Sequence, residues 1–214
     1  MNAAPELPHD LLEIAGPAAL AFDGPAPRWV AASLERAPFV VVRRAEQRGG
    51  TVPVGVRGAR RNERCPAWLE RRDAVRRIRP EDLAAARAWR GHTRIAQLAA
   101  LDAVAEAMRA HGLAWGPTGS TGFQLATGAR CVDAASDLDL LVRAPGGLSP
   151  AAAGRLLAAL APLPVAVDVQ VETTGGAVAL AELASGARRV VLRTTRGPIL
   201  VPAPWAARPR TAPA

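Results

Sequence analysis

The fold is decided by residues 136–142, which read Ser136-Asp137-Leu138-Asp139-Leu140-Leu141-Val142. Side chains alternate between the two faces of a β-strand, so this run predicts a strand with both aspartates on one face and apolar residues on the other. By the rise of a strand, the Cα atoms of Asp137 and Asp139 lie about 7 Å apart. Carboxylates this close repel each other, and bound divalent cations relieve the repulsion. Magnesium prefers oxygen ligands and keeps positions open for substrate phosphates. Asp137 and Asp139 are therefore candidate catalytic and metal-binding residues, with two Mg2+ ions as the expected cofactor.

Residues 165–172 predict a second strand with the same alternation. Its valines point to the core, whereas Asp168 points to the other face. If this strand pairs beside the first, Asp168 completes a cluster of three carboxylates, where it would bind metal and help to deprotonate the attacking hydroxyl. Glu172 remains open as the alternative third carboxylate.

Gly119 and Ser120 lie between a predicted strand that ends near Thr118 and a short segment that ends at Gly128. Glycine lets the backbone approach phosphate oxygens, and a hydroxyl with exposed N–H groups at a turn into a helix binds them. We expect this pair to bind the substrate's phosphates rather than to act as a nucleophile. The lysine of a P-loop is absent from the motif.

Positive charge is concentrated between Arg43 and Arg79, where 12 arginines stand against four acidic residues. This excess equals the formal net charge of +8, so the remainder of the chain is balanced. Such a surface is typical of contact with an anionic partner, although solvated arginines are the alternative. Arg57, Arg60 and Arg61 are the candidate substrate-binding residues, because a guanidinium binds phosphate or carboxylate in a bidentate manner.

Several classes of protein are disfavoured. Cys65 and Cys131 are isolated, which predicts neither a zinc site nor a disulfide framework. The longest apolar run, residues 156–167, contains prolines and is shorter than the roughly 18 residues of a membrane span, so we expect a soluble, cytoplasmic protein with no membrane partner. No nucleic-acid partner is expected either, because Trp68 is the sole aromatic residue from Val40 to Arg79 and a stacking platform is missing. A non-catalytic nucleic-acid-binding protein is the weaker alternative.

The remaining patterns predict an α+β fold with two domains. A small mixed α/β N-terminal domain is expected over residues 1–91 and a catalytic domain, a mixed sheet with helices, over residues 92–205. The tail after Pro202 is expected to fray. Helices are predicted over residues 28–35, 80–89, 93–110, 149–161 and 179–185, and strands over 39–43, 51–57, 137–143, 165–172 and, as a hairpin, 188–201, with a basic loop between 57 and 80.

The order of the motifs carries more information than any one of them. A Gly-Ser turn, then Asp-x-Asp in an apolar strand, then a lone aspartate in a valine-rich strand resembles the DNA polymerase β-type nucleotidyltransferase superfamily. The resemblance implies a nucleotidyltransferase fold for the catalytic domain. Another enzyme of this superfamily, one that adenylylates a small molecule or a protein, is the first alternative function.

A closer resemblance extends over most of the chain. The chain is similar to the phosphoribosyl-dephospho-CoA transferases of malonate decarboxylase, also called malonate decarboxylase holo-acyl-carrier-protein synthases or the MdcG family. The segments that carry it are His9-Asp10-Leu11-Leu12, residues 52–58 (Val-Pro-Val-Gly-Val-Arg-Gly), 115–120 (Trp-Gly-Pro-Thr-Gly-Ser), Gly122-Phe123, 125–128 (Leu-Ala-Thr-Gly), 136–140 (Ser-Asp-Leu-Asp-Leu) and 192–198 (Leu-Arg-Thr-Thr-Arg-Gly-Pro).

This resemblance implies a specific reaction. The donor would be 2′-(5″-triphosphoribosyl)-3′-dephospho-CoA, and the acceptor a serine of the acyl-carrier subunit of malonate decarboxylase. A phosphodiester would form and pyrophosphate would leave. The family motifs include Gly119, Ser120, Asp137 and Asp139, whereas Asp168 follows from superfamily logic and its strand pattern. Two polyanionic partners would also account for the basic segment.

Overall fold

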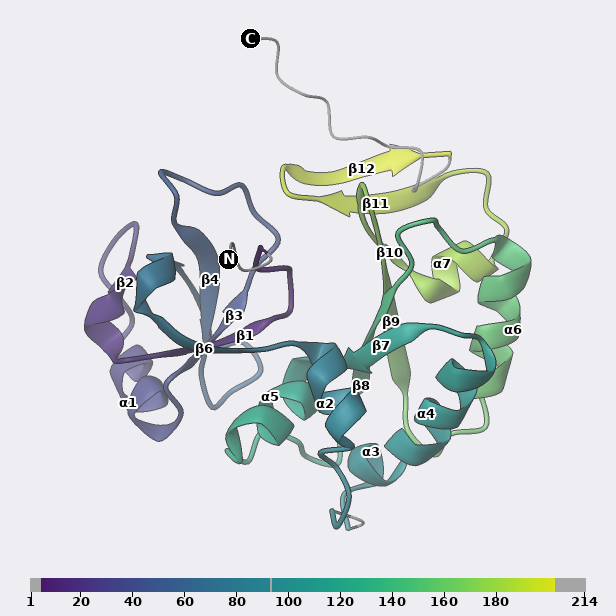
Figure 1. The fold of residues 1–214 in the computed structure, drawn as a ribbon, viewed down its shortest axis with the longest axis horizontal. Coiled ribbons are helices and arrows are strands. Elements are labelled where there is room, and N and C mark those ends of the chain that lie inside the picture. The colour runs from purple at the N-terminus through teal and green to yellow at the C-terminus, as the bar shows by residue number, and fades with distance from the viewer. Residues whose placement is uncertain (1–4, 93, 203–214) are drawn as a thin grey trace, which may run out of the picture.

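A computed structural model of the chain describes residues 5–92 and 94–202. Within these residues the strands form two six-stranded sheets, one from each half of the chain, which lie side by side in Figure 1. The fold therefore belongs to the predicted α+β class. No helix in the described part of the chain is long and apolar enough to cross a membrane.

The first half contains an antiparallel sheet with the strand order β2-β5-β4-β3-β1-β6. Helix α1 covers one face, where Val30 and Leu34 pack against buried residues such as Leu12, Val40 and Val54. The other face turns towards the second half. The elements are β1 (Leu11–Ile14), β2 (Leu20–Ala21), α1 (Trp29–Arg36), β3 (Phe39–Val42), β4 (Val52–Arg57), β5 (Arg64–Leu69), β6 (Ala74–Ile78) and α2 (Pro80–Ala86).

The second half contains a mixed sheet with the order β12-β11-β10-β9-β8-β7. Strands β8 and β9 pair in parallel and are connected through α6, whereas the other neighbours are antiparallel. A mixed sheet with helices is consistent with the nucleotidyltransferase fold. The elements are α3 (Ala96–Ala99), α4 (Leu101–Ala110), β7 (Ala114–Pro117), α5 (Gly119–Thr127), β8 (Leu138–Arg143), α6 (Pro150–Leu160), β9 (Val167–Thr173), β10 (Gly176–Ala179), α7 (Leu180–Ala184), β11 (Val190–Thr194) and β12 (Gly197–Val201).

The two faces of strand β8 have opposite characters, as its sequence predicts. Leu138, Leu140 and Val142 are fully buried in the core formed with α4, α6 and α7. Asp139 lies on the opposite face, which turns towards the first half and leads into a shared cavity. The hydrophobic core of the second half therefore determines which way the carboxylate points.

Most predicted elements are present, and the differences have local causes. Ser149 caps α6 as predicted, its Oγ accepting a hydrogen bond from the Ala152 N–H at 3.2 Å. The predicted basic loop is wrong: it contains β5 and β6, because the alternating residues Cys65, Ala67 and Leu69 complete the first core. Strands β1, β2 and β10 were also not predicted. The predicted helix over 93–110 is divided into α3 and α4.

Some predictions concern residues that the structure does not describe. Thr93, the tail after Pro202 and residues 203–205 of the predicted catalytic domain lie outside the described residues. The boundary near Gly91 remains a prediction. Helix α2 precedes that point but contacts β7 and α5 of the second half, and Trp89 belongs to the core of the second half.

The contact between α2 and β7 can be tested at Gly116. A methyl group at Gly116 would fall 2.0 Å from the backbone carbonyl of Pro80, which cannot move aside as a flexible side chain can. We expect Gly116→Ala to lower the free energy of unfolding by about 1–3 kcal/mol in urea denaturation. Gly154→Ala is the matched control, because Gly154 lies in α6 with no atom within 4 Å of the added methyl. Alanine has a higher helix propensity than glycine, so Gly154→Ala should keep or raise the free energy of unfolding. Equal losses of this free energy in both variants would contradict the close packing at Gly116.

Candidate active site

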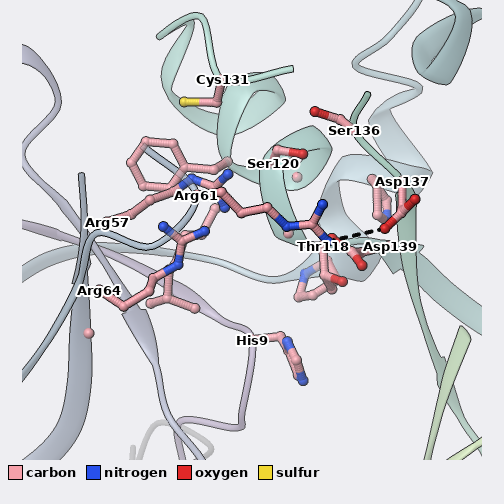
Figure 2. Close-up of a pocket in the computed structure, with 18 of the residues that line it drawn as sticks. His9, Arg57, Arg61, Arg64, Thr118, Ser120, Cys131, Ser136, Asp137 and Asp139 are labelled. Atoms are coloured by element: carbon pink, nitrogen blue, oxygen red, sulfur yellow. Dashed lines mark hydrogen bonds and ion pairs between the residues drawn. The ribbon is translucent and has the colours of Figure 1, made fainter. Parts of the chain in front are cut away.

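A cavity of about 560 Å³ lies between the two halves of the chain. The first half contributes cationic side chains, and the second half contributes hydroxyl and carboxylate groups, as Figure 2 shows. The polar lining residues are His9, Arg43, Arg57, Arg61, Arg64, Thr118, Ser120, Cys131, Asp133, Ser136, Asp137 and Asp139. The structure therefore brings together Gly119, Ser120, Asp137, Asp139, Arg57 and Arg61 of the predicted site.

The parallel pairing of β8 and β9 places Asp168 directly opposite Asp139. Burial, followed by the negative charges of Asp168 and Asp137, raises the pKa of the Asp139 carboxyl group. The three carboxylates are therefore close enough to influence one another. Asp168 itself is exposed and is not among the residues that line the cavity.

Glu172, the alternative third carboxylate, has a different environment. It lies opposite Arg143 in the β8–β9 register and forms a buried ion pair with Arg44 of the first half. Asp168, not Glu172, is thus the β9 carboxylate next to Asp139. Among the described residues, no three His, Cys, Asp or Glu side chains are already arranged as a metal-binding group. A metal role for the three aspartates remains a prediction.

The Gly119-Ser120 turn is packed directly against Asp139. Gly119 has a φ of 56°, and a Cβ atom there would lie 1.8 Å from Oδ2 of Asp139. The Thr118 N–H donates to the backbone carbonyl of Asp139 at 2.8 Å. The side chain of the N-cap residue Thr118 does not cap α5, which starts at Gly119, and Ser120 is buried in the first turn of this helix. This geometry explains why glycine is required and leaves the first helical N–H groups uncapped next to the carboxylates.

The arginine wall of the cavity agrees only in part with the sequence prediction. Arg61 donates to Asp137 Oδ2 at 3.2 Å and spans the cavity in Figure 2. The guanidinium of Arg57 lies 5.9 Å from the centre of the Phe123 ring. Burial lowers the pKa of Arg57, although a guanidinium remains charged in proteins. Arg60 is exposed and does not line the cavity, whereas Arg64, which was not predicted, does. Arg64 pairs with Arg57 in the register of β4 and β5, and knowledge of this pairing would have predicted its place in the cavity.

Buried ion pairs connect the two halves beside the cavity. Arg143, on the same strand as Asp139, donates to Glu81 Oε1 at 2.6 Å and lies 3.8 Å from Asp10. Asp10 has no exposed surface. Arg44 and Glu172 form the second pair, and both side chains are at least 85% buried. These contacts hold the arginine-bearing sheet against the carboxylate-bearing sheet.

His9 was not predicted as a site residue, although it lines the cavity. Its backbone is left-handed, with a φ of 75°, and its N–H donates to the Val42 carbonyl at 3.0 Å. Burial, followed by the positive charges of Arg44 and Arg143, lowers the pKa of His9 to about 4, and a hydrogen bond with Gln170 offsets only part of this effect. The imidazole is therefore neutral at pH 7.

Two family models together match nearly the whole chain. The model described as the phosphoribosyl-dephospho-CoA transferase MdcG N-terminal domain matches residues 7–80. The model described as the MdcG C-terminal domain matches residues 82–204. No solved structure matches the chain.

Curated relatives carry the name phosphoribosyl-dephospho-CoA transferase. The protein from Pseudomonas putida (strain W619) is 46% identical over 203 residues, which cover 95% of this chain and 96% of that protein. The Azotobacter vinelandii protein is 45% identical over 200 residues, covering 92% and 93%. A Klebsiella pneumoniae protein is 41% identical over 206 residues, covering 96% and 98%.

The environment of His9 predicts a contribution to acid sensitivity. With a folded pKa of about 4 against an ordinary value of 6.5, His9 binds fewer protons in the folded than in the unfolded chain across this range. Its contribution to the free energy of unfolding therefore falls as the pH is lowered from 6.5 to 4. We expect His9→Asn, which tolerates the left-handed backbone, to lose less stability than the wild type between these pH values. Urea denaturation at several pH values measures the difference, and parallel curves would show that the buried imidazole does not titrate as described.

Proposed function

Because the chain belongs to the phosphoribosyl-dephospho-CoA transferase family and is a transferase, we propose that it attaches 2′-(5″-phosphoribosyl)-3′-dephospho-CoA to a carrier protein. The proposed donor is the corresponding 5″-triphosphate, and the proposed acceptor is a serine of the acyl-carrier subunit of malonate decarboxylase. The observation that supports this proposal best is the cavity in which arginines of one half face carboxylates of the other. The arginines can bind a triphosphate, and the carboxylates can hold the cations that stabilise phosphoryl transfer.

The reaction is a displacement at the α-phosphorus of the donor. The bond between the serine Oγ and this phosphorus forms, while the bond from phosphorus to the oxygen of pyrophosphate breaks. The hydroxyl proton passes to a neighbouring base, for which Asp168 is our candidate because it lies opposite Asp139 in the sheet.

The phosphates are bound by the turn and the arginines in this proposal. The uncapped N-terminus of α5 offers backbone N–H groups, and Ser120 adds a hydroxyl group in the same turn. Arg57, Arg61 and Arg64 provide guanidinium groups on the facing wall. Ser120 is then a binding residue, and no covalent adduct forms on it.

Asp137, Asp139 and Asp168 are the residues that would hold magnesium. Their oxygen atoms match its preference, and the negative charges of Asp168 and Asp137 contribute, after burial, to the raised pKa of Asp139. Gly119 leaves space directly beside Asp139 Oδ2 that any side chain would fill. Bound magnesium would supply positive charge for the attacking and leaving oxygens.

One incubation tests the proposal. The protein, magnesium, the triphosphoribosyl donor and the apo carrier subunit are mixed, and the carrier is measured by intact mass spectrometry. We expect the carrier to gain one phosphoribosyl-dephospho-CoA group on a serine, and no addition when ATP replaces the donor. An adenylylated carrier, or a carrier left unmodified by the triphosphoribosyl donor, would contradict the proposed function.

The carboxylate centre predicts a separation of activity from stability. Asp139→Asn removes a proposed magnesium ligand, so we expect transfer to fall by orders of magnitude. It also removes one of three neighbouring negative charges, so the melting temperature without metal should stay equal or rise. Asp73→Asn, outside the cavity, is the matched control and should transfer at the wild-type rate. If Asp139→Asn keeps more than about a tenth of wild-type turnover, a loss of only ~1.4 kcal/mol, the assignment of Asp139 is wrong.

A further inference from the structure

One segment of the first half has a sequence pattern that the proposed chemistry does not explain. Residues 52–57 read Val-Pro-Val-Gly-Val-Arg and form strand β4. The three valines are at most 1% exposed and complete the core beneath the sheet. Pro53, Gly55 and Arg57 therefore share the opposite face. Proline and glycine are poor strand formers, and a glycine inside a strand often marks a site where another group approaches the backbone closely.

The neighbouring strands extend the same face into a flat surface. Gly55 pairs with Val41 of β3 on one side and with Pro66 of β5 on the other. All three residues line the cavity. Three adjacent strands span about 10 Å at the usual spacing. The side chains across this width are an isopropyl group, a hydrogen atom and a pyrrolidine ring, and we call these three residues the apolar floor.

Guanidinium groups border the apolar floor. Arg57 and Arg64 form the next cross-strand pair along β4 and β5. The Arg43 side chain reaches over the floor at Gly55: its Nε donates to the Val54 carbonyl at 2.8 Å, and its Cδ and Cγ lie 3.3 and 3.5 Å from the position of a Cβ at Gly55. The floor is therefore uncharged, and its arginine border continues through Arg61 to Asp137.

We propose that the apolar floor, Val41, Gly55 and Pro66, is the subsite for the purine base of the donor. This inference rests on the proposed function, because the base belongs to the dephospho-CoA part of that donor. A purine buries its flat faces against apolar groups, and it stacks on guanidinium planes. The cavity therefore offers an uncharged surface for the base and, beyond it, charged groups for the phosphates.

The absence of a side chain at Gly55 is the feature that the experiment changes. Gly55→Leu adds a branched side chain to the floor and pushes the flexible Arg43 chain aside, whereas Gly55→Ala adds one methyl group that meets the Arg43 chain at 3.3 Å and the Cys65 carbonyl at 3.9 Å. Gly154→Leu is the matched control, because it adds the same side chain to open space on α6, outside the cavity. Calorimetry on the full chain measures the binding of three probes: 3′-dephospho-CoA, 4′-phosphopantetheine, which lacks the base, and inorganic tripolyphosphate.

We expect Gly55→Leu to weaken dephospho-CoA binding about tenfold or more and Gly55→Ala to weaken it less, with tripolyphosphate binding unchanged in both. Gly154→Leu should bind all three probes as the wild type does. If Gly55→Leu does not fold, as judged by its melting curve, unchanged dephospho-CoA binding by Gly55→Ala overturns the proposal.

Three other results would overturn the proposal as well. The first is unchanged dephospho-CoA binding by folded Gly55→Leu. The second is an equal loss of tripolyphosphate binding, which would assign the effect to the arginines. The third is an equal loss of phosphopantetheine binding, which would place the pantetheine arm on the floor. Carrier modification by the wild type is measured separately, so failure of the proposed function is distinguishable from failure of the base subsite.

Discussion

The parallel pairing of β8 with β9 is the constraint on which the rest of the structure depends. It places Asp139 opposite Asp168 and stacks the leucines and valines of the two strands into one buried layer. Burying that layer turns the carboxylates outward to a single side, where their negative charges accumulate. Positive groups from outside this sheet can balance the negative charge of the aspartates, and arginines of the first half line the same cavity. The arginines of the first half therefore face the carboxylates of the second half across the cavity.

Buried ion pairs, rather than a continuous apolar interface alone, align the two halves. Removing one partner of such a pair typically costs about 3–5 kcal/mol, because the other charge is left without compensation. The pair of Arg44 with Glu172 and the contacts of Arg143 with Asp10 and Glu81 therefore penalise other relative positions of the sheets. A small apolar cluster around Leu11 and Phe123 adds contact area between the two halves. Directional ion pairs define the shape of the cavity more sharply than apolar contacts could.

Much of this arrangement could be predicted from local patterns, and the remainder depends on strand partners that no local pattern contains. Alternation of aspartate with leucine indicated the character of β8, and glycine followed by serine indicated the turn from which α5 starts. The choice between Asp168 and Glu172 required the register of β9. Likewise, Arg64 rather than Arg60 lines the cavity because β5 pairs with β4, and the arginines around β5 and within β6 hid their strands. No local pattern marked His9 as a residue of the cavity, because its lowered pKa arises from burial and from arginines that are distant in the sequence.

The cations and the carboxylates of the cavity rest on two separate hydrophobic cores. A substitution that repacks one core shifts one wall of the cavity and leaves the geometry of the other wall intact. Under the proposed function, ligand selection and catalysis would therefore rest on separate structural modules that can diversify at different rates during evolution. A descendant of this fold could acquire a new ligand through changes in the first sheet alone, while the aspartates of β8 and β9 keep their mutual spacing.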